Sequence, residues 1–145
     1  MKKINISRVV LGGLIASIAF IFIQFGFEGF LSLVLNFNEA KLSQQYFPDI
    51  TLSGTRYHII NILYLISICT ITVWLYAMFL PKTGFSIKTS IIASLTVIFI
   101  IILLLINHIN MGIYPIKLTL ISLCFSLIEF PLSIIIGTSF YKTNK

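Results

Sequence analysis

The chain has 145 residues, of which 58% are hydrophobic and only 10% are charged, and its mean hydropathy is +1.05. A soluble domain usually carries about 25% charged residues, and a soluble fold of this length could not hide so much apolar surface from water. The net charge of +6 does not indicate nucleic-acid binding, because the basic residues stand singly at the ends of apolar runs. We therefore expect an integral membrane protein that is surrounded largely by the lipid bilayer.

Four apolar runs follow one another along the chain, over about residues 9–34, 57–80, 87–106 and 118–141. Each reaches the roughly 20 residues that a helix needs to cross the hydrocarbon core. Strands are a poor alternative, because an open sheet leaves backbone groups unpaired in lipid. The predicted fold class is therefore all-α, an integral membrane four-helix transmembrane bundle that forms a single transmembrane domain over residues 1–145.

The three connections between these runs differ in length. Residues 81–84 begin with proline and end with glycine, which predicts a tight turn. Residues 107–117 form a short polar link, in which Pro115 suits the start of the last helix. Residues 36–56 form a longer loop, for which the sequence leaves open both a short interfacial helix and an irregular chain.

Lysine and arginine residues are distributed unevenly between the two ends of the predicted bundle. Seven lie on the side that holds both termini, and three lie on the other side. Because cytoplasmic loops carry an excess of basic residues, we expect a multi-pass protein of the cell membrane with both termini in the cytoplasm. The seven are Lys2, Lys3, Arg8, Lys82, Lys88, Lys142 and Lys145, and the three are Lys41, Arg56 and Lys117.

Two acids, Glu28 and Glu129, stand inside the first and fourth predicted helices. A charged carboxylate at the centre of a bilayer costs about 2.5–3.5 kcal/mol on an insertion scale, so such a residue normally faces the interior of a bundle. Each acid lies on a helix face of small and polar residues, near Gln24 on the first helix and Ser126 on the fourth. We call Gln24, Glu28, Ser126 and Glu129 the polar seam, which serves either to pack the helices or to line a functional path.

The two acids are expected at different depths in the bilayer. At 1.5 Å per residue, Glu28 should lie about 9 Å from the outer end of its helix, and Glu129 about 16 Å from the outer end of its own. We therefore expect separate hydrogen bonds to Ser, Thr, Asn or Gln side chains rather than a direct carboxyl pair. Pro131 should bend the fourth helix close to Glu129.

A second candidate site, an outer pocket, follows from the topology. His58 and Asn61 open the second predicted helix, while Asn107 and His108 close the third, so all four lie on the outer side. Glu28 should lie about 9 Å deeper, and the five side chains could converge on one outward-facing pocket. Two histidines and a carboxylate are suitable ligands for a metal ion, and two histidines for a haem. Neither histidine stands in a recognised ligand spacing, so we expect no bound metal and no cofactor.

The sequence contains no HExxH, GxSxG, P-loop, dinucleotide-binding or haem-attachment motif, so we expect the protein not to be an enzyme. Two functions remain. The first is a non-enzymatic bundle that assembles with itself, as a homo-oligomer, or with a larger membrane complex, and uses its polar faces as helix contacts. The alternative is a small proton-linked transporter or channel in which Glu28 and Glu129 line the path.

The stretch from Arg8 to Ala16 reads RVVLGGLIA, and Gln24 and Glu28 follow it. It resembles the opening of a group of small, uncharacterised bacterial four-helix membrane proteins, whose first helix starts R-V-x-x-G-G-L-x-A and carries an acidic or amide pair. The resemblance covers about one helix, and Gln24 stands where the pattern of the group has an acid. It implies bacterial origin and no defined activity. Together with the four predicted spans, this leads us to expect a location in the bacterial inner membrane.

Overall fold

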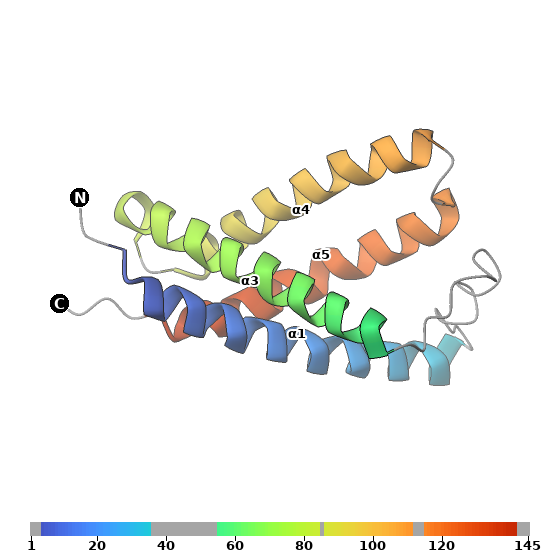
Figure 1. The fold of residues 1–145 in the computed structure, drawn as a ribbon, viewed down its shortest axis with the longest axis horizontal. Coiled ribbons are helices and arrows are strands. Elements are labelled where there is room, and N and C mark those ends of the chain that lie inside the picture. Colours follow the sequence, from blue (N-terminus) through green and yellow to red (C-terminus); the bar gives the residue numbers. More distant parts are fainter. Residues whose placement is uncertain (1–3, 36–54, 85, 112–114, 142–145) are drawn as a thin grey trace.

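The computed structural model describes four stretches of the chain: residues 4–35, 55–84, 86–111 and 115–141. These stretches hold four α-helices and no strand (Figure 1): α1 (Ile6–Leu35), α3 (Thr55–Thr83), α4 (Ile87–Asn110) and α5 (Ile116–Ser139). Each helix contains a stretch long and apolar enough to cross a membrane. The predicted all-α, four-helix transmembrane bundle is thus confirmed, and the chain is a multi-pass membrane protein.

The turn between α3 and α4 lies slightly later than predicted. α3 continues through Pro81, because a proline removes only one backbone hydrogen bond from the last turn of a helix. The turn follows at Gly84, whose φ of 74° lies in the left-handed region that glycine adopts readily. Ser86 then caps α4 by accepting a hydrogen bond from the Thr89 N–H. Residues 36–54, which include most of the predicted outer loop, lie outside the described stretches.

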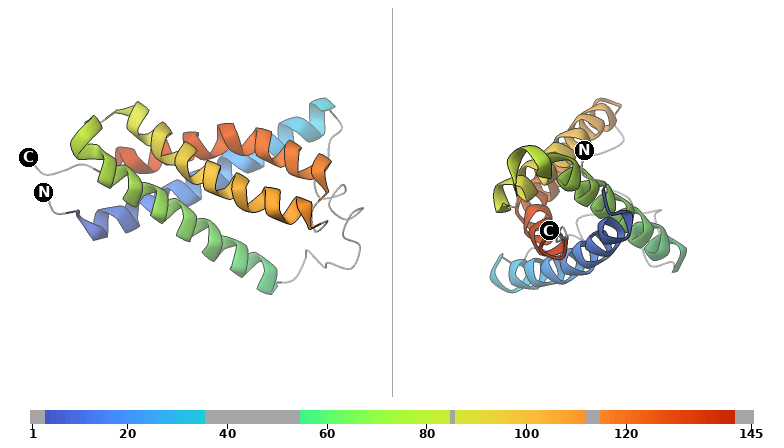
Figure 2. Two further views of the ribbon diagram at one scale, coloured as in Figure 1. Left: turned by 90° about the horizontal axis from the view of Figure 1, so that it is seen from above. Right: turned by 90° about the vertical axis from the view of Figure 1, so that its left-hand side faces the viewer.

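The helices run alternately up and down, so the start of α1 and the end of α5 lie at one end of the bundle (Figure 1). α1 and α4 occupy opposite corners, each packs against α3 and α5, and α3 also touches α5 (Figure 2). We call the end with the start of α1, the end of α5 and the α3–α4 turn the closed end, and the opposite end the open end. At the closed end, the Asn5 N–H donates to the Tyr141 hydroxyl over 3.4 Å and so joins the two ends of the described chain.

Glycine residues let α1 approach both of its neighbours near the closed end. A Cβ atom added to Gly13 would lie 2.6 Å from the Cα of Thr70 on α3. A Cβ atom added to Gly137 on α5 would lie 2.6 Å from the Cβ of Ala16 on α1. Carbon atoms do not pack at such distances, so these helix contacts require glycine. Small residues at close crossings are the usual means by which membrane helices associate.

Buried hydroxyl groups and an aromatic pair complete the closed end. The Thr138 hydroxyl donates to the Ile134 carbonyl at 2.8 Å, so the Ser90 hydroxyl of α4 donates to Thr138 at 2.7 Å. The rings of Tyr76 and Tyr141 meet edge to face, with centroids 6.1 Å apart. Among the described residues, no buried side-chain nitrogen or oxygen lacks a hydrogen-bond partner. Buried polar groups need such partners in lipid, because no water is present there to replace a missing hydrogen bond.

Toward the open end the helices spread apart (Figure 2). Fully buried side chains such as Val73, Ser94 and Ile134 lie nearer the closed end. In contrast, the outer half of α1 carries large exposed side chains such as Phe22 and Phe25. Small residues let membrane helices approach, and the close glycine contacts lie near the closed end, so the bundle is narrow there and has a wedge shape.

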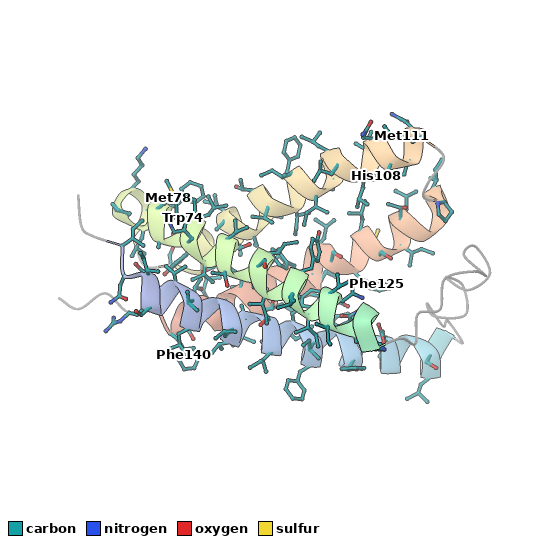
Figure 3. All side chains as sticks on the ribbon, viewed as in Figure 1. Trp74, Met78, His108, Met111, Phe125 and Phe140 are labelled. Carbon is teal, nitrogen blue, oxygen red and sulfur yellow. The ribbon has the colours of Figure 1, made fainter. Side chains whose placement is uncertain are left out.

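The outer surface of the bundle carries large apolar side chains. Trp74, Met78 and Phe140 project outward near the closed end, and Met111 ends α4 at the open end (Figure 3). Their exposed fractions lie between 44% and 64%. In water such a surface would drive association, whereas in a bilayer it contacts the acyl chains.

Candidate functional site

A cavity of about 500 Å³, which we call the large cavity, lies among the helices toward the open end. Its volume falls within the roughly 300–1,000 Å³ that is usual for small-molecule sites. All four helices contribute to its wall, and α4 contributes the aliphatic side chains of Ile98, Ile101 and Leu105. The polar side chains in the wall come from the other three helices: Gln24, Asn61, Tyr64, Thr119, Ser122 and Ser126.

A smaller cavity of about 90 Å³ is lined, among the described residues, by α1 and α5, and we call it the acid chamber because both Glu28 and Glu129 line it. Its other lining residues are Phe20, Gln24, Ser122, Phe125 and Ser126. Four residues line both cavities, so the two cavities share a wall: Phe20, Gln24, Ser122 and Ser126. The structure thereby brings all four residues of the polar seam to one place.

The two acids reach one chamber although they start at different depths along their helices. In a helix each Cα–Cβ bond tilts toward the N-terminus. Because α1 and α5 run antiparallel, Glu28 leans toward the closed end and Glu129 toward the open end, and the two side chains lean toward each other. The sequence predicted separate hydrogen bonds for the two acids rather than a direct carboxyl pair, and Glu28 accepts one from Gln24, while the direction of the side chains brings both acids to one chamber.

The two acids differ in their exposure to the surroundings of the protein. Glu129 is only 6% exposed. Glu28 is exposed, although it lines the chamber together with residues of α5. The expectation that both acids face the bundle interior is thus corrected for Glu28, which lines the chamber from an exposed position. The Gln24 Nε2 atom donates to Glu28 Oε1 at 3.1 Å, as residues four apart on a helix can do.

Two hydroxyl groups beside the large cavity direct their protons at their own helix. The Ser126 hydroxyl donates to the Ser122 carbonyl at 2.8 Å, and the Thr119 hydroxyl donates to the Pro115 carbonyl at 3.0 Å. A hydroxyl group has one proton and two lone pairs. Both side chains therefore offer acceptor oxygen atoms to the cavity, and their single protons are already used.

The four residues of the predicted outer pocket do not share the large cavity. Asn61 lines it, whereas His58, Asn107 and His108 are not among its lining residues. His58 and Asn107 are exposed, and the Nδ1 atom of His108 lies 2.8 Å from the Leu104 carbonyl of its own helix (Figure 3). The helix ends that carry them are spread apart at the open end. Within the described stretches, no three His, Cys, Asp or Glu side chains are placed to hold a metal ion.

Three aromatic residues at the large cavity were missed by the sequence reasoning. Phe20 and Phe130 meet edge to face with centroids 6.2 Å apart, and Tyr64 lies in the wall on α3. In an apolar run, an aromatic residue that faces a cavity has the same appearance as one that faces lipid. The sequence positions of Phe20 and Phe130 could have indicated that they lie near the polar seam, because Phe20 lies one helical turn before Gln24 and Phe130 follows Glu129 directly.

Comparison with known proteins gives no match for this chain: no family model, no curated protein and no solved structure matches it. The resemblance of the first helix to a group of small bacterial membrane proteins stays a prediction.

Proposed function

We propose that the protein is a small proton-linked transporter that binds its substrate in the large cavity and exchanges it for a proton on the acids of the polar seam. The observation that carries the proposal is the wall shared by a cavity of about 500 Å³ and a chamber lined by Glu28 and Glu129. A helix bundle that only packed against itself would not need a cavity of small-molecule size next to two acids.

Proton coupling follows from the cost of an uncompensated charge in a membrane. A buried carboxylate is stable when it carries a proton or when a cation lies near it. Around the two cavities, the described titratable side chains are Glu28 on α1, Tyr64 on α3 and Glu129 on α5, while α4 contributes aliphatic residues. Arrival of a cationic substrate would stabilise the ionised form of Glu129, and departure would favour its protonation. This exchange links substrate movement to proton movement.

The closed end supplies a means of alternating access. It is held by close glycine contacts and by the hydrogen bond between Ser90 and Thr138, both of which can separate without breaking a helix. Pro131 lies inside α5, two residues after Glu129, and removes one backbone hydrogen bond there. A bend at this point would let the closed end part while the open end approaches.

The orientation of the transporter is proposed from the charge split predicted from the sequence, which assigns seven basic residues to the side of the closed end and three to the other side. We place the closed end in the cytoplasm and the open end outside it. The membrane would be the inner membrane of a bacterium, as the resemblance of the first helix implies. In this orientation the large cavity faces outward.

Assembly is the second candidate function, and one observation favours it. Gly26 and Gly29 in the outer half of α1 have open space where a Cβ atom would be, and the neighbouring Phe30 is exposed. Unused small residues on a membrane helix suit the close approach of another helix, either from a second copy or from a larger membrane partner.

Proteoliposomes that contain the full chain and a trapped pH-sensitive dye test the proposal. Inorganic cations, amines, amino acids and sugars are added outside in turn, and the pH inside is followed against protein-free vesicles. We expect one class to change the internal pH, and Glu129→Gln to abolish the change, whereas Thr96→Val on α4 leaves it intact. Contradiction would come from an unaltered response in Glu129→Gln, or from no response with any class by protein that remains helical.

A further inference from the structure

We infer that the large cavity recognises a lipophilic amine in its protonated form, with the ammonium group at the wall shared with the acid chamber and the apolar body toward α4. This inference rests on the proposed transport function and names its substrate class. Three independent features of the cavity carry it: the charge around it, the polarity of its hydrogen-bonding groups and the nature of its walls.

The charge around the large cavity is negative or neutral. Glu28 and Glu129 lie in the adjoining acid chamber, and none of the described residues that line either cavity is a lysine, arginine or histidine. Low-dielectric walls strengthen the field of a charge and focus it into a cleft. An ionised carboxylate behind the shared wall would therefore attract a cation into the large cavity and repel an anion.

Three polar side chains of the large cavity offer it acceptor oxygen atoms: Ser126 and Gln24 at the shared wall, and Thr119 elsewhere in the lining. Ser126 and Thr119 have given their protons to backbone carbonyls of α5 and the residue before it. Gln24 directs its amide nitrogen at Glu28, and its carbonyl oxygen remains an acceptor. A ligand that brought only acceptors would leave these oxygen atoms without hydrogen-bond partners. An ammonium group, which carries N–H donors and a positive charge, matches them.

The remaining walls suit an apolar body. Phe20 and Phe130 form an aromatic corner next to the shared wall, and Tyr64 adds a third ring from α3. Aromatic faces attract cations by about 0.5–2 kcal/mol. Ile98 and Ile101 of α4 form an aliphatic surface on the other side. A hydrophilic amine such as a free amino acid would leave this surface uncovered.

Three compounds that share one apolar cage and differ in charge test the inference: 1-adamantylammonium, 1-adamantanol and 1-adamantanecarboxylate. The full chain is placed in nanodiscs of phosphatidylcholine, which has no primary amine, and binding is measured by equilibrium dialysis against empty nanodiscs. We expect the ammonium compound to bind at least about tenfold more tightly than the other two. Adding phosphatidylethanolamine identifies the source of the amine: competition assigns it to a lipid headgroup, and no competition assigns it to a free amine.

Matched variants locate the recognition. Glu129→Gln should weaken binding of the ammonium compound about tenfold and leave that of the alcohol unchanged. Ser126→Ala should weaken it several-fold, because it removes an acceptor oxygen atom at the shared wall. Thr96→Val is the control, since Thr96 also donates to a carbonyl of its own helix, at 2.8 Å, but lies outside both cavities. Retained unfolding temperatures show that the variants fold.

The outcomes separate this inference from the proposed function. Equal binding of the three compounds would overturn ammonium recognition and leave a ligand-binding transporter in place. Absence of binding, together with a proton response to another substrate class in proteoliposomes, would overturn the substrate class alone. Absence of both responses would overturn both proposals.

Discussion

Glu129 combines two properties that rarely occur together in a membrane helix: it is ionisable, and only 6% of its surface is exposed. Its carboxyl group lines a chamber of about 90 Å³ with a second acid, a glutamine and two serines. A group in such surroundings either stabilises the bundle through hydrogen bonds or exchanges a proton during function. The two roles make different demands on the side chain, and a substitution of equal shape separates them.

Glu129→Gln is expected to change the unfolding free energy by less than about 1 kcal/mol, because the amide keeps the shape and both kinds of hydrogen-bonding group. Thermal unfolding in detergent, followed by size-exclusion chromatography, measures this. If the acid is only a structural contact, the proton response in proteoliposomes should survive as well, and if it couples protons, that response should vanish while the protein stays folded. Loss of the folded protein in Glu129→Gln would contradict both expectations.

At the scale of the helices, the closed end depends on a few positions where no side chain fits. Gly137→Ala on α5 would place a methyl group 2.6 Å from the Ala16 Cβ and 3.1 Å from the Ala16 nitrogen on α1. Helices that are forced apart lose packing over several residues, and overpacking of this kind costs about 1–3 kcal/mol. A glycine-to-alanine substitution at a position with open space around it should instead leave the stability unchanged or raise it.

We therefore expect Gly137→Ala to lower stability by about 1–3 kcal/mol, and Gly26→Ala to leave it unchanged or raise it by up to about 1 kcal/mol, since alanine favours the helix. A methyl group on Gly26 would meet no other atom within 4 Å. Unfolding curves of the two variants in the same detergent make the comparison. A Gly26→Ala variant as damaged as Gly137→Ala would indicate that Gly26 contacts another chain, which is the assembly function.

The hydrogen bond between Ser90 on α4 and Thr138 on α5 is a second contact between helices, and its contribution to stability can be measured. In membrane proteins such side-chain bonds contribute about 0.6 kcal/mol on average and at most about 1.7 kcal/mol. A double-mutant cycle with Ser90→Ala and Thr138→Val should give a coupling energy in this range. Ser139→Ala is a suitable control, because the Ser139 hydroxyl is exposed and donates to the Ile136 carbonyl of its own helix at 2.7 Å. Zero coupling would show that this hydrogen bond does not hold α4 against α5.

At the scale of the whole molecule, the fold follows from the lengths of the four apolar runs, because lipid permits few structures other than helices. The wedge shape and the large cavity do not follow from the sequence, since they depend on which residues of different helices meet. The polar seam was predictable from spacing on α1 and α5, whereas the meeting of Glu28 and Glu129 depends on antiparallel packing and the lean of the side chains. The predicted grouping of His58 with His108 assumed that helix ends on one side of the membrane lie together, and the spread of the open end separates them from the cavity.

The orientation of the whole molecule gives the last prediction. The start of α1 and the end of α5 lie at the closed end. The topology predicted from the sequence assigns seven of the ten basic residues to this side, so we expect this end in the cytoplasm. A reporter enzyme that is active only outside the cytoplasm should be silent when fused after Lys145 and active when fused near Leu52. A second reporter that is fluorescent only in the cytoplasm should give the reverse pattern at the same two positions and so control for expression. The opposite result with both reporters would turn the large cavity toward the cytoplasm. The proposed exchange would then begin with a substrate from inside the cell, although its chemistry at the shared wall would be the same.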